Sequence, residues 1–266
     1  MYFVARKWFG FNREWAAPLA SGISICGVSA AIATGGAIRA RPVVPVLVSS
    51  LVVIFAVIEV LILPFLAQTF LSHEPLVAGA WMGLAVKTDG AAVAAGGITE
   101  SLILAKSAAE GIKYQPGWIL GTTATVKVFI DIFIGIWAFV LGWIWTNHIN
   151  VTQDRAKIGE IWERFPKFII GFVITFAVGL YLALGTPADI ASKVPAAIGE
   201  ANTFRVIFFI LTFFSIGVLS NFKKLWQEGI GKLAAVYLVS LFGFVIWVGL
   251  LISWLFFAGI KPPLAS

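Results

Sequence analysis

The stretch Val86-Lys87-Thr88-Asp89-Gly90 places a lysine and an aspartate inside an otherwise apolar run. Residues 76–85 on one side and residues 91–98 on the other carry no charge. A charged side chain at mid-membrane depth costs several kcal/mol, by estimates that start at about 2.5 kcal/mol. Such groups persist where they face a cavity, pair with each other or bind an ion, and the nearby glycines favour an interrupted helix. We therefore predict that this stretch is the working site of a transporter.

The composition of the whole chain favours a lipid bilayer as its solvent. Of 266 residues, 60% are hydrophobic and only 12% are charged, and the mean hydropathy is +0.96, as membrane proteins require. The net charge of +6 resides mainly between apolar segments, which indicates orientation in a membrane and no nucleic-acid partner. The single cysteine, Cys26, excludes an intrachain disulfide and a cysteine-based metal cluster.

Apolar segments recur along the chain and predict an all-α, polytopic membrane protein with about seven transmembrane segments. Each approaches or exceeds the roughly 20 residues that a helix needs to cross the hydrocarbon core. We expect one integral membrane domain over residues 1–266, with two discontinuous, glycine-rich segments, the first and the third. The seven segments are 16–38, 43–70, 76–104, 117–148, 167–185, 203–220 and 232–260.

The basic residues predict the orientation in a cell inner membrane. If all seven segments cross, the positive-inside rule puts the N-terminal segment 1–15 in the cytoplasm and the C-terminus outside. Residues 149–166 then form a cytoplasmic amphipathic connector, because charges of both signs alternate there at helical spacing. If the seven segments cross in alternation, Arg39 and Arg41 lie on the outer side.

The two glycine-rich segments resemble each other. Residues 30–36, Ala-Ala-Ile-Ala-Thr-Gly-Gly, align with residues 91–97, Ala-Ala-Val-Ala-Ala-Gly-Gly. Paired interruptions at corresponding places are typical of a transporter's binding site. Small residues also suit close packing of membrane helices, and the two interpretations are compatible.

The first glycine-rich segment offers polar groups for an anion. An interrupted helix exposes backbone N–H groups where its second half begins, and the positive end of the helix dipole lies there too. Hydroxyls in membrane helices also bond simply to the carbonyl one turn back, so this alternative stays open for each. The candidate lining residues here are Ser24, Cys26, Gly27, Ser29 and Thr34.

Lys87 and Asp89 allow three interpretations. They form a structural ion pair, or Lys87 attracts an anion that Asp89 tunes, or one of them exchanges a proton because burial disfavours its charged form. Residues two apart do not face each other on a helix, so a direct pair requires non-helical backbone from Thr88 to Gly90. We include all four residues in the candidate site.

A second charged pair, Lys127 and Asp131, lies at spacing i, i+4 in the fourth segment. It is either a self-neutralising buried pair or part of the substrate path. Glu59 is expected near the membrane interface. The sequence contains no nucleophile triad, phosphate loop or cluster of metal ligands, so we expect neither an enzyme nor a cofactor nor a metal ion.

Several of these stretches resemble the YeiH-type putative sulfate exporter family. Residues 24–34, Ser-Ile-Cys-Gly-Val-Ser-Ala-Ala-Ile-Ala-Thr, are similar to its Ser-Ile-Cys-Gly signature, and Lys7 to Phe11 resemble the loop before it. Residues 81–96 are similar to its second signature, and Lys127-Val128 falls where the family has Arg-Val. Asn202 to Phe204 and Gly217 to Leu219 resemble its late segment.

The resemblance implies part of a sodium/proton-antiporter-like inverted-repeat fold that transports sulfate or a related anion. Three departures bear on that expectation. The family's His-Glu falls on Lys87-Thr88, with Asp89 in place of an apolar residue; Gly35-Gly36 replaces a frequent Glu-Pro; and the family's first helices are missing.

We therefore expect a secondary transporter for a small inorganic or organic anion, working by alternating access around two broken helices. Cation/proton exchange through Lys87 and Asp89, with H+ or Na+ as the ion, is the alternative. A further alternative is a non-transporting subunit whose missing helices come from a partner chain or a second copy.

Overall fold

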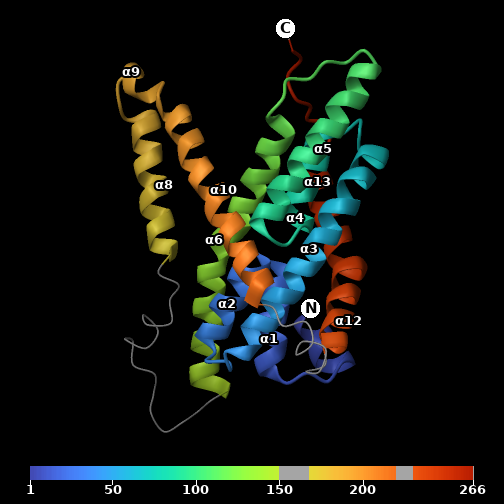
Figure 1. Ribbon diagram of the computed structural model, residues 1–266, viewed down its shortest axis with the longest axis vertical. Helices are drawn as coiled ribbons and strands as arrows, with labels where there is room; N and C mark the ends of the chain where they lie inside the picture. The colour runs from blue at the N-terminus through green and yellow to red at the C-terminus, as the bar shows by residue number, and fades with distance from the viewer. Residues whose placement is uncertain (150–167, 220–229, 266) are drawn as a thin grey trace.

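The computed structural model describes residues 1–149, 168–219 and 230–265, and these residues are almost entirely helical (Figure 1). Within the described residues, three helical stretches are long and apolar enough to cross a membrane. They are α3 (Val43–Phe70), α6 (Trp118–Ile144) continued by the π-helix η2 (Trp145–Ile149), and α12 (Ile230–Ser240) continued by η3 (Leu241–Val245) and α13 (Ile246–Phe257). These stretches identify a multi-pass helical membrane protein.

The helix bounds follow the predicted apolar segments closely in most places. The helix α3 has the bounds predicted for the second segment, and α8 (Phe168–Leu184) lies within the fifth. The sixth segment differs, because α10 (Val194–Leu219) begins nine residues before the predicted start and follows the short α9 (Ala188–Ala191). The predicted connector 149–166 lies outside the described residues except for Ile149.

The first glycine-rich segment is a hairpin of two short helices, α1 (Arg13–Ser24) and α2 (Gly27–Ala37). Ile25 and Cys26 have non-helical backbone angles, with φ/ψ of −112°/−97° and −132°/78°. A Cβ atom on Gly22 would lie 3.6 Å from the Cβ atom of Ala31. Nine residues of continuous helix would span about 13.5 Å, so the chain folds back and the two helices run antiparallel.

The third predicted segment folds back in the same way, as α4 (Pro75–Ala85) and α5 (Asp89–Ala109). Val86 and Thr88 are extended, which ends one helix and starts the next. Thr123 of α6 touches both arms of this hairpin: its hydroxyl donates to the Gly79 carbonyl at 2.8 Å, and a Cβ atom on Gly96 would lie 2.6 Å from the same hydroxyl.

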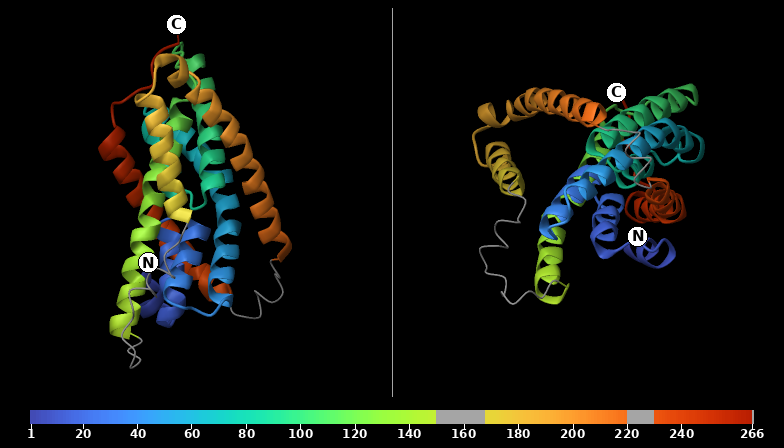
Figure 2. Two further views of the ribbon diagram at one scale, coloured as in Figure 1. Left: turned by 90° about the vertical axis from the view of Figure 1, so that its left-hand side faces the viewer. Right: turned by 60° about the horizontal axis from the view of Figure 1, so that its bottom comes forward.

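The two hairpins enter the molecule from opposite ends and meet in its middle, as Figures 1 and 2 show. The expectation that both segments cross the membrane is therefore corrected: each returns to the end from which it came. In the first hairpin, Gly22 and Ala31 allow this, because small residues let antiparallel helices approach closely.

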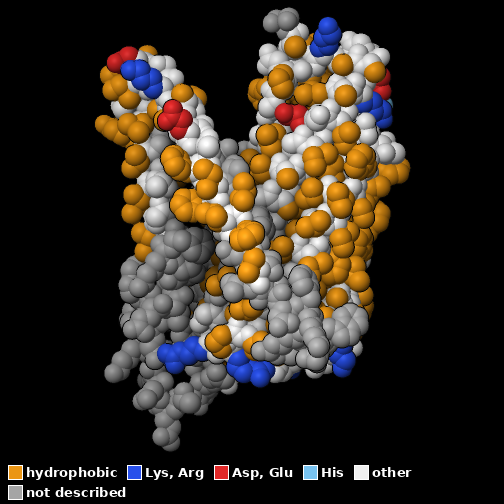
Figure 3. Space-filling model, in the orientation of Figure 1, with side chains coloured by type: hydrophobic (Ala, Val, Ile, Leu, Met, Phe, Trp, Pro, Cys, Tyr) orange, Lys and Arg blue, Asp and Glu red, His pale blue; other side chains and the backbone are white. Residues whose placement is uncertain are grey.

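The hairpin also corrects the predicted side of Arg41. Its backbone N–H and Nε donate to Glu14 Oε1 at 2.7 Å and 3.1 Å, which places Arg41 at the same end as the start of α1. Figure 3 shows basic side chains at this lower end, charges of both signs at the upper end, and an apolar belt between them. This distribution is that of a membrane-spanning protein.

Candidate functional site

The tips of the two hairpins touch each other. A Cβ atom on Gly27 would lie 2.5 Å from the carbonyl oxygen of Lys87 and 2.4 Å from Cγ1 of Val52. Only a residue without a side chain fits between the second hairpin and α3 at this point. The candidate site is built around this contact.

Lys127 of α6 lies against both tips. Its ammonium donates to the carbonyl oxygens of Ile25 at 3.4 Å and Val86 at 3.3 Å, directly after the C-terminal ends of α1 and α4. The negative ends of two helix dipoles therefore face one buried lysine, which is a favourable arrangement. The same ammonium lies 3.8 Å from Oδ1 of Asp89.

Asp89 is the first residue of α5, where the positive end of the helix dipole stabilises a carboxylate. Thr88 caps the same helix, because its hydroxyl accepts from the backbone N–H of Ala91 at 3.3 Å. The thiol of Cys26, in the other tip, donates to Asp89 Oδ1 at 3.0 Å. A charged residue and a thiol thus join the tips directly.

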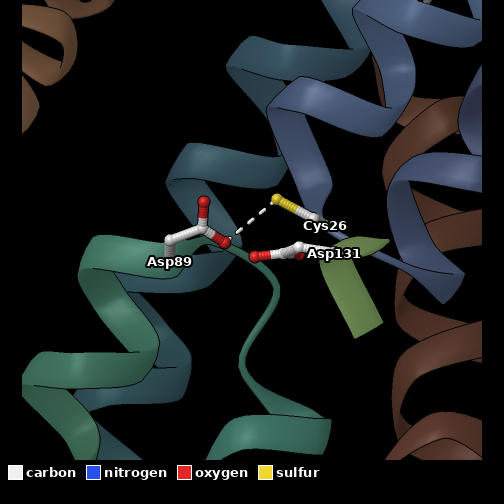
Figure 4. A group of neighbouring side chains, drawn as sticks. All are labelled: Cys26, Asp89 and Asp131. Atoms are coloured by element: carbon white, nitrogen blue, oxygen red, sulfur yellow. Dashed lines mark hydrogen bonds between the residues drawn. The ribbon is translucent and has the colours of Figure 1, made fainter. Parts of the chain in front are cut away.

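Asp131 completes the group from α6, one turn after Lys127. Figure 4 shows the side chains of Cys26, Asp89 and Asp131 converging from the turn between α1 and α2, the start of α5 and α6. One donor atom from each of the three lies within 4.8 Å of the others. Among the described residues, Oδ1 of Asp131 has no hydrogen-bond partner although it is sealed from solvent. We refer to Cys26, Lys87, Asp89, Lys127 and Asp131 as the tip cluster.

Lys87 is sealed in the protein rather than open to a cavity. Its side chain is fully buried and its ammonium donates to the carbonyl oxygen of Leu84, in the last turn of α4. Its backbone N–H donates to Oε2 of Glu59 at 3.0 Å. Lys87 therefore stabilises the end of α4 and anchors the second tip to α3.

Glu59 is a functional candidate, and its predicted position near the membrane interface is wrong. It is 3% exposed in the middle of α3, where it accepts from Lys87 and, at 3.1 Å, from the hydroxyl of Tyr237 in α12. The ring of Tyr237 stacks on Phe55 at a centroid distance of 4.5 Å. The available signal was a lone acid deep inside a long apolar helix, which by itself indicates a functional or paired group.

The structure decides between the pairings that the sequence left open. The non-helical residues are Val86 to Thr88, and Asp89 and Gly90 already belong to α5, so the predicted interruption lies about two residues earlier. Asp89 pairs with Lys127 rather than with Lys87. The i, i+4 spacing suggested an ion pair between Lys127 and Asp131. The ammonium of Lys127 instead pairs with Asp89, in the tip of the second hairpin.

The remaining predicted site residues lie around the tips at various distances. Ser29 is half-buried in the first turn of α2, whereas Thr34 is buried about two turns from the tip. Ser24 is exposed and lines an apolar cavity of about 570 Å³ between α1 and α6. Gly90 lines a cavity of about 330 Å³ between α3 and α5, together with Thr88.

The fold and the tip cluster define a multi-pass helical membrane protein with two facing hairpins and buried charges where they meet. Comparison with known sequences places it further: residues 1–249 match the family described as conserved hypothetical protein 698, and the chain belongs to that family. Several of its relatives carry the name UPF0324 membrane protein. No solved structure matches.

Three relatives show the extent of the similarity. A UPF0324 membrane protein of Nitrosomonas europaea is 44% identical over 99% of this chain, which covers 54% of that protein. An uncharacterized protein of Archaeoglobus fulgidus is 48% identical over 54% of this chain and 89% of its own length. A UPF0324 membrane protein of Rhodopirellula baltica is 33% identical over 79% of this chain and 36% of its own length. The chain thus spans about half the length of the Nitrosomonas relative.

Proposed function

We propose that this chain forms the ion-handling part of a secondary transporter that moves a small anion, such as sulfate or a related sulfur oxyanion. The observation that carries the proposal is the contact between the tips of two hairpins that enter from opposite ends. Movement of one tip opens the contact toward one side of the membrane, and movement of the other tip opens it toward the opposite side. That is the requirement of alternating access.

The polarity of the tips supports an anion as the substrate. Both α2 and α5 begin at the tips, so the positive ends of two helix dipoles point to the contact. The helix α2 begins without a side-chain cap, and Lys127 adds a positive charge beside both tips. The resemblance to the putative sulfate exporters favours an oxyanion such as sulfate as the substrate.

The test is counterflow of radiolabelled sulfate into proteoliposomes that contain the purified protein. We expect uptake by the unaltered protein and by Lys193→Gln, whose exposed lysine lies near α9, and a loss of at least about tenfold for Lys127→Gln. Folded protein without uptake of sulfate, sulfite or thiosulfate would refute the anion proposal. Uptake that appears only after a partner chain is added would assign the chain to a partner-dependent subunit.

A second candidate, cation/proton exchange, is favoured by the two carboxylates of the tip cluster. Asp89 and Asp131 face one ammonium, that of Lys127, so the acids are in excess where the tips meet. A proton or a sodium ion would balance that charge. Sodium-driven proton movement in the same proteoliposomes, without sulfate uptake, would favour this function over the first.

We propose the orientation from the same geometry. The base of the first hairpin, with Arg13, Arg39 and Arg41, faces the cytoplasm by the positive-inside rule. The opposite end, with the start of α4, faces outward. A cysteine introduced at Lys113 should react with an impermeant maleimide added outside cells, and one introduced at Lys7 should not.

A further inference from the structure

We infer that Cys26, Asp89 and Asp131 form a binding site for a thiophilic divalent metal ion, of the chemical class of Zn²⁺ and Cd²⁺. The three residues come from the first tip, the second tip and α6, and their donor atoms lie within 4.8 Å of one another (Figure 4). No regular spacing along the chain signals this group, because residues 26, 89 and 131 are brought together only by the two hairpins. The inference is independent of what the protein transports.

The distances fit an ion after a small movement. A tetrahedral ion at about 2.0–2.3 Å from its ligands separates those ligands by roughly 3.3–3.8 Å. Cys26 Sγ and Asp89 Oδ1 are 3.0 Å apart, so this edge is already short enough. The longest separation in the group needs to close by at most about 1 Å, which a change of side-chain rotamer can supply.

One oxygen of the Asp131 carboxyl group lacks a hydrogen-bond partner, which favours a ligand at this place. A buried carboxylate oxygen without a hydrogen bond is costly, and native structures seldom keep one without a reason. Among the described residues, Oδ1 of Asp131 is such a buried oxygen without a hydrogen bond. An ion between Asp131 and the tips would satisfy it.

The charges balance when a divalent ion is bound. A thiolate and two carboxylates carry three negative charges, and a divalent ion together with Lys127 carries three positive charges. Without the ion, the thiol keeps its proton, and the carboxyl groups of Asp89 and Asp131 face the single ammonium of Lys127. Binding releases the thiol proton of Cys26 to water.

The donor set selects the metal. One sulfur and two carboxylate oxygens suit Zn²⁺ or Cd²⁺, with water in the fourth position, whereas Ca²⁺ and Mg²⁺ take oxygen ligands only. The side chain of Asp89 is 26% exposed and gives an ion a path to the buried thiol. The neighbouring ammonium of Lys127, 3.8 Å from Asp89, is a tethered competitor for the same carboxylate.

The test is titration of the purified protein with Cd²⁺, monitored by the ultraviolet charge-transfer band of a cadmium thiolate. Because Cys26 is the single cysteine of the chain, the band reports on this site alone. We expect one Cd²⁺ per chain, no band in Cys26→Ser, and affinity at least about tenfold weaker in Asp131→Asn and in Asp89→Asn. The exposed-acid control Asp189→Asn should bind as the unaltered protein does.

A second measurement covers variants that do not fold. In the unaltered protein, Cd²⁺ should slow alkylation of Cys26 by a maleimide, and a chelator should restore the rate. Absence of the band and of this protection would overturn the site. A band of equal affinity in folded Asp131→Asn and Asp89→Asn would also overturn it, because the cysteine would then bind cadmium alone. Sulfate uptake is not part of either measurement, so failure of the metal site leaves the transport proposal separately testable.

Discussion

Gly27 and the carbonyl oxygen of Lys87 are in direct contact where the two hairpins meet, since a Cβ atom on Gly27 would lie 2.5 Å from that oxygen. The contact joins residues that are sixty positions apart in the chain and that belong to hairpins from opposite ends of the molecule. It therefore fixes the relative position of the two tips, on which both proposals depend.

Replacing this glycine should separate the tips. We expect Gly27→Ala to destabilise the protein by about 1–3 kcal/mol, as overpacking does, because the opposing atom is backbone and cannot rotate away. Gly36→Ala is the matched control: it lies in the same helix with no atom within 4 Å of the added Cβ, and it should be neutral or stabilising by up to about 1 kcal/mol. Thermal unfolding in detergent measures both, and equal effects of the two substitutions would contradict the tip contact.

Removing the lysine between the tips should leave Asp89 and two helix ends without their positive partner. We expect Lys127→Met to cost about 3 kcal/mol, the lower end for breaking a buried ion pair, because Asp89 is partly exposed. Adding Asp89→Asn to Lys127→Met should recover part of the loss, and Lys193→Met, which changes an exposed lysine, should have no effect. Additive losses in the double variant would show that the two residues do not interact.

Glu59 should depend on Tyr237 for its stability in the core. Tyr237→Phe keeps the stacked ring against Phe55 but removes the hydroxyl that donates to Glu59, so we expect a loss of about 1–3 kcal/mol. Tyr181→Phe is the control, because Tyr181 is 66% exposed. In a double-mutant cycle with Glu59→Met, which removes the acceptor, a coupling energy near zero would disprove the hydrogen bond.

The base of the first hairpin should respond to acid. Burial raises the pKa of Glu14, but the hydrogen bonds and the positive charge of Arg41 outweigh it, so the pKa lies below its usual value of 4.5. The folded state therefore gains stability from the ionised carboxylate above that value and loses it as the pH falls through the lowered pKa. The gain is well under about 1 kcal/mol, because the pair is partly exposed.

Unfolding of the unaltered protein and of Glu14→Gln, compared between neutral pH and pH values below the usual carboxyl range, measures this effect. The difference in midpoint should shrink as the pH falls. A difference that is constant with pH would mean that the charge of Glu14 contributes nothing to the hairpin.

Part of this architecture was accessible from sequence patterns. The apolar run 43–70 predicted α3 with its bounds, because length and hydropathy alone decide whether a helix suits a bilayer. The glycine-rich composition of the first and third segments, and the charges at Lys87 and Asp89, predicted that both segments are interrupted, because local backbone preference and the cost of a buried charge are properties of the residues themselves. The aligned stretches 30–36 and 91–97, where the paired interruptions were predicted, are instead continuous helix within α2 and α5. The family resemblance rested on the same two stretches.

The direction of the chain after each interruption could not be predicted from these sequence patterns. Whether a helix continues or folds back depends on contacts such as that of Gly22 with Ala31, which local propensity does not record. The wrong expectation that the first glycine-rich segment crosses the membrane also put Arg39 and Arg41 on the wrong side. The two chain ends lie at opposite ends of the molecule (Figure 1); their sides of the membrane stay a prediction.

The sequence by itself determined that this protein is a helical membrane protein with two interrupted segments and charges inside its apolar stretches, since composition and periodicity follow from residue types alone. Only the tertiary structure decided which charges meet: Asp89 with Lys127, Lys87 with the end of α4, and Glu59 with Tyr237. The physical reason is that Coulomb and hydrogen-bond energies depend on distance in space, and the two hairpins bring into contact residues that are far apart along the chain.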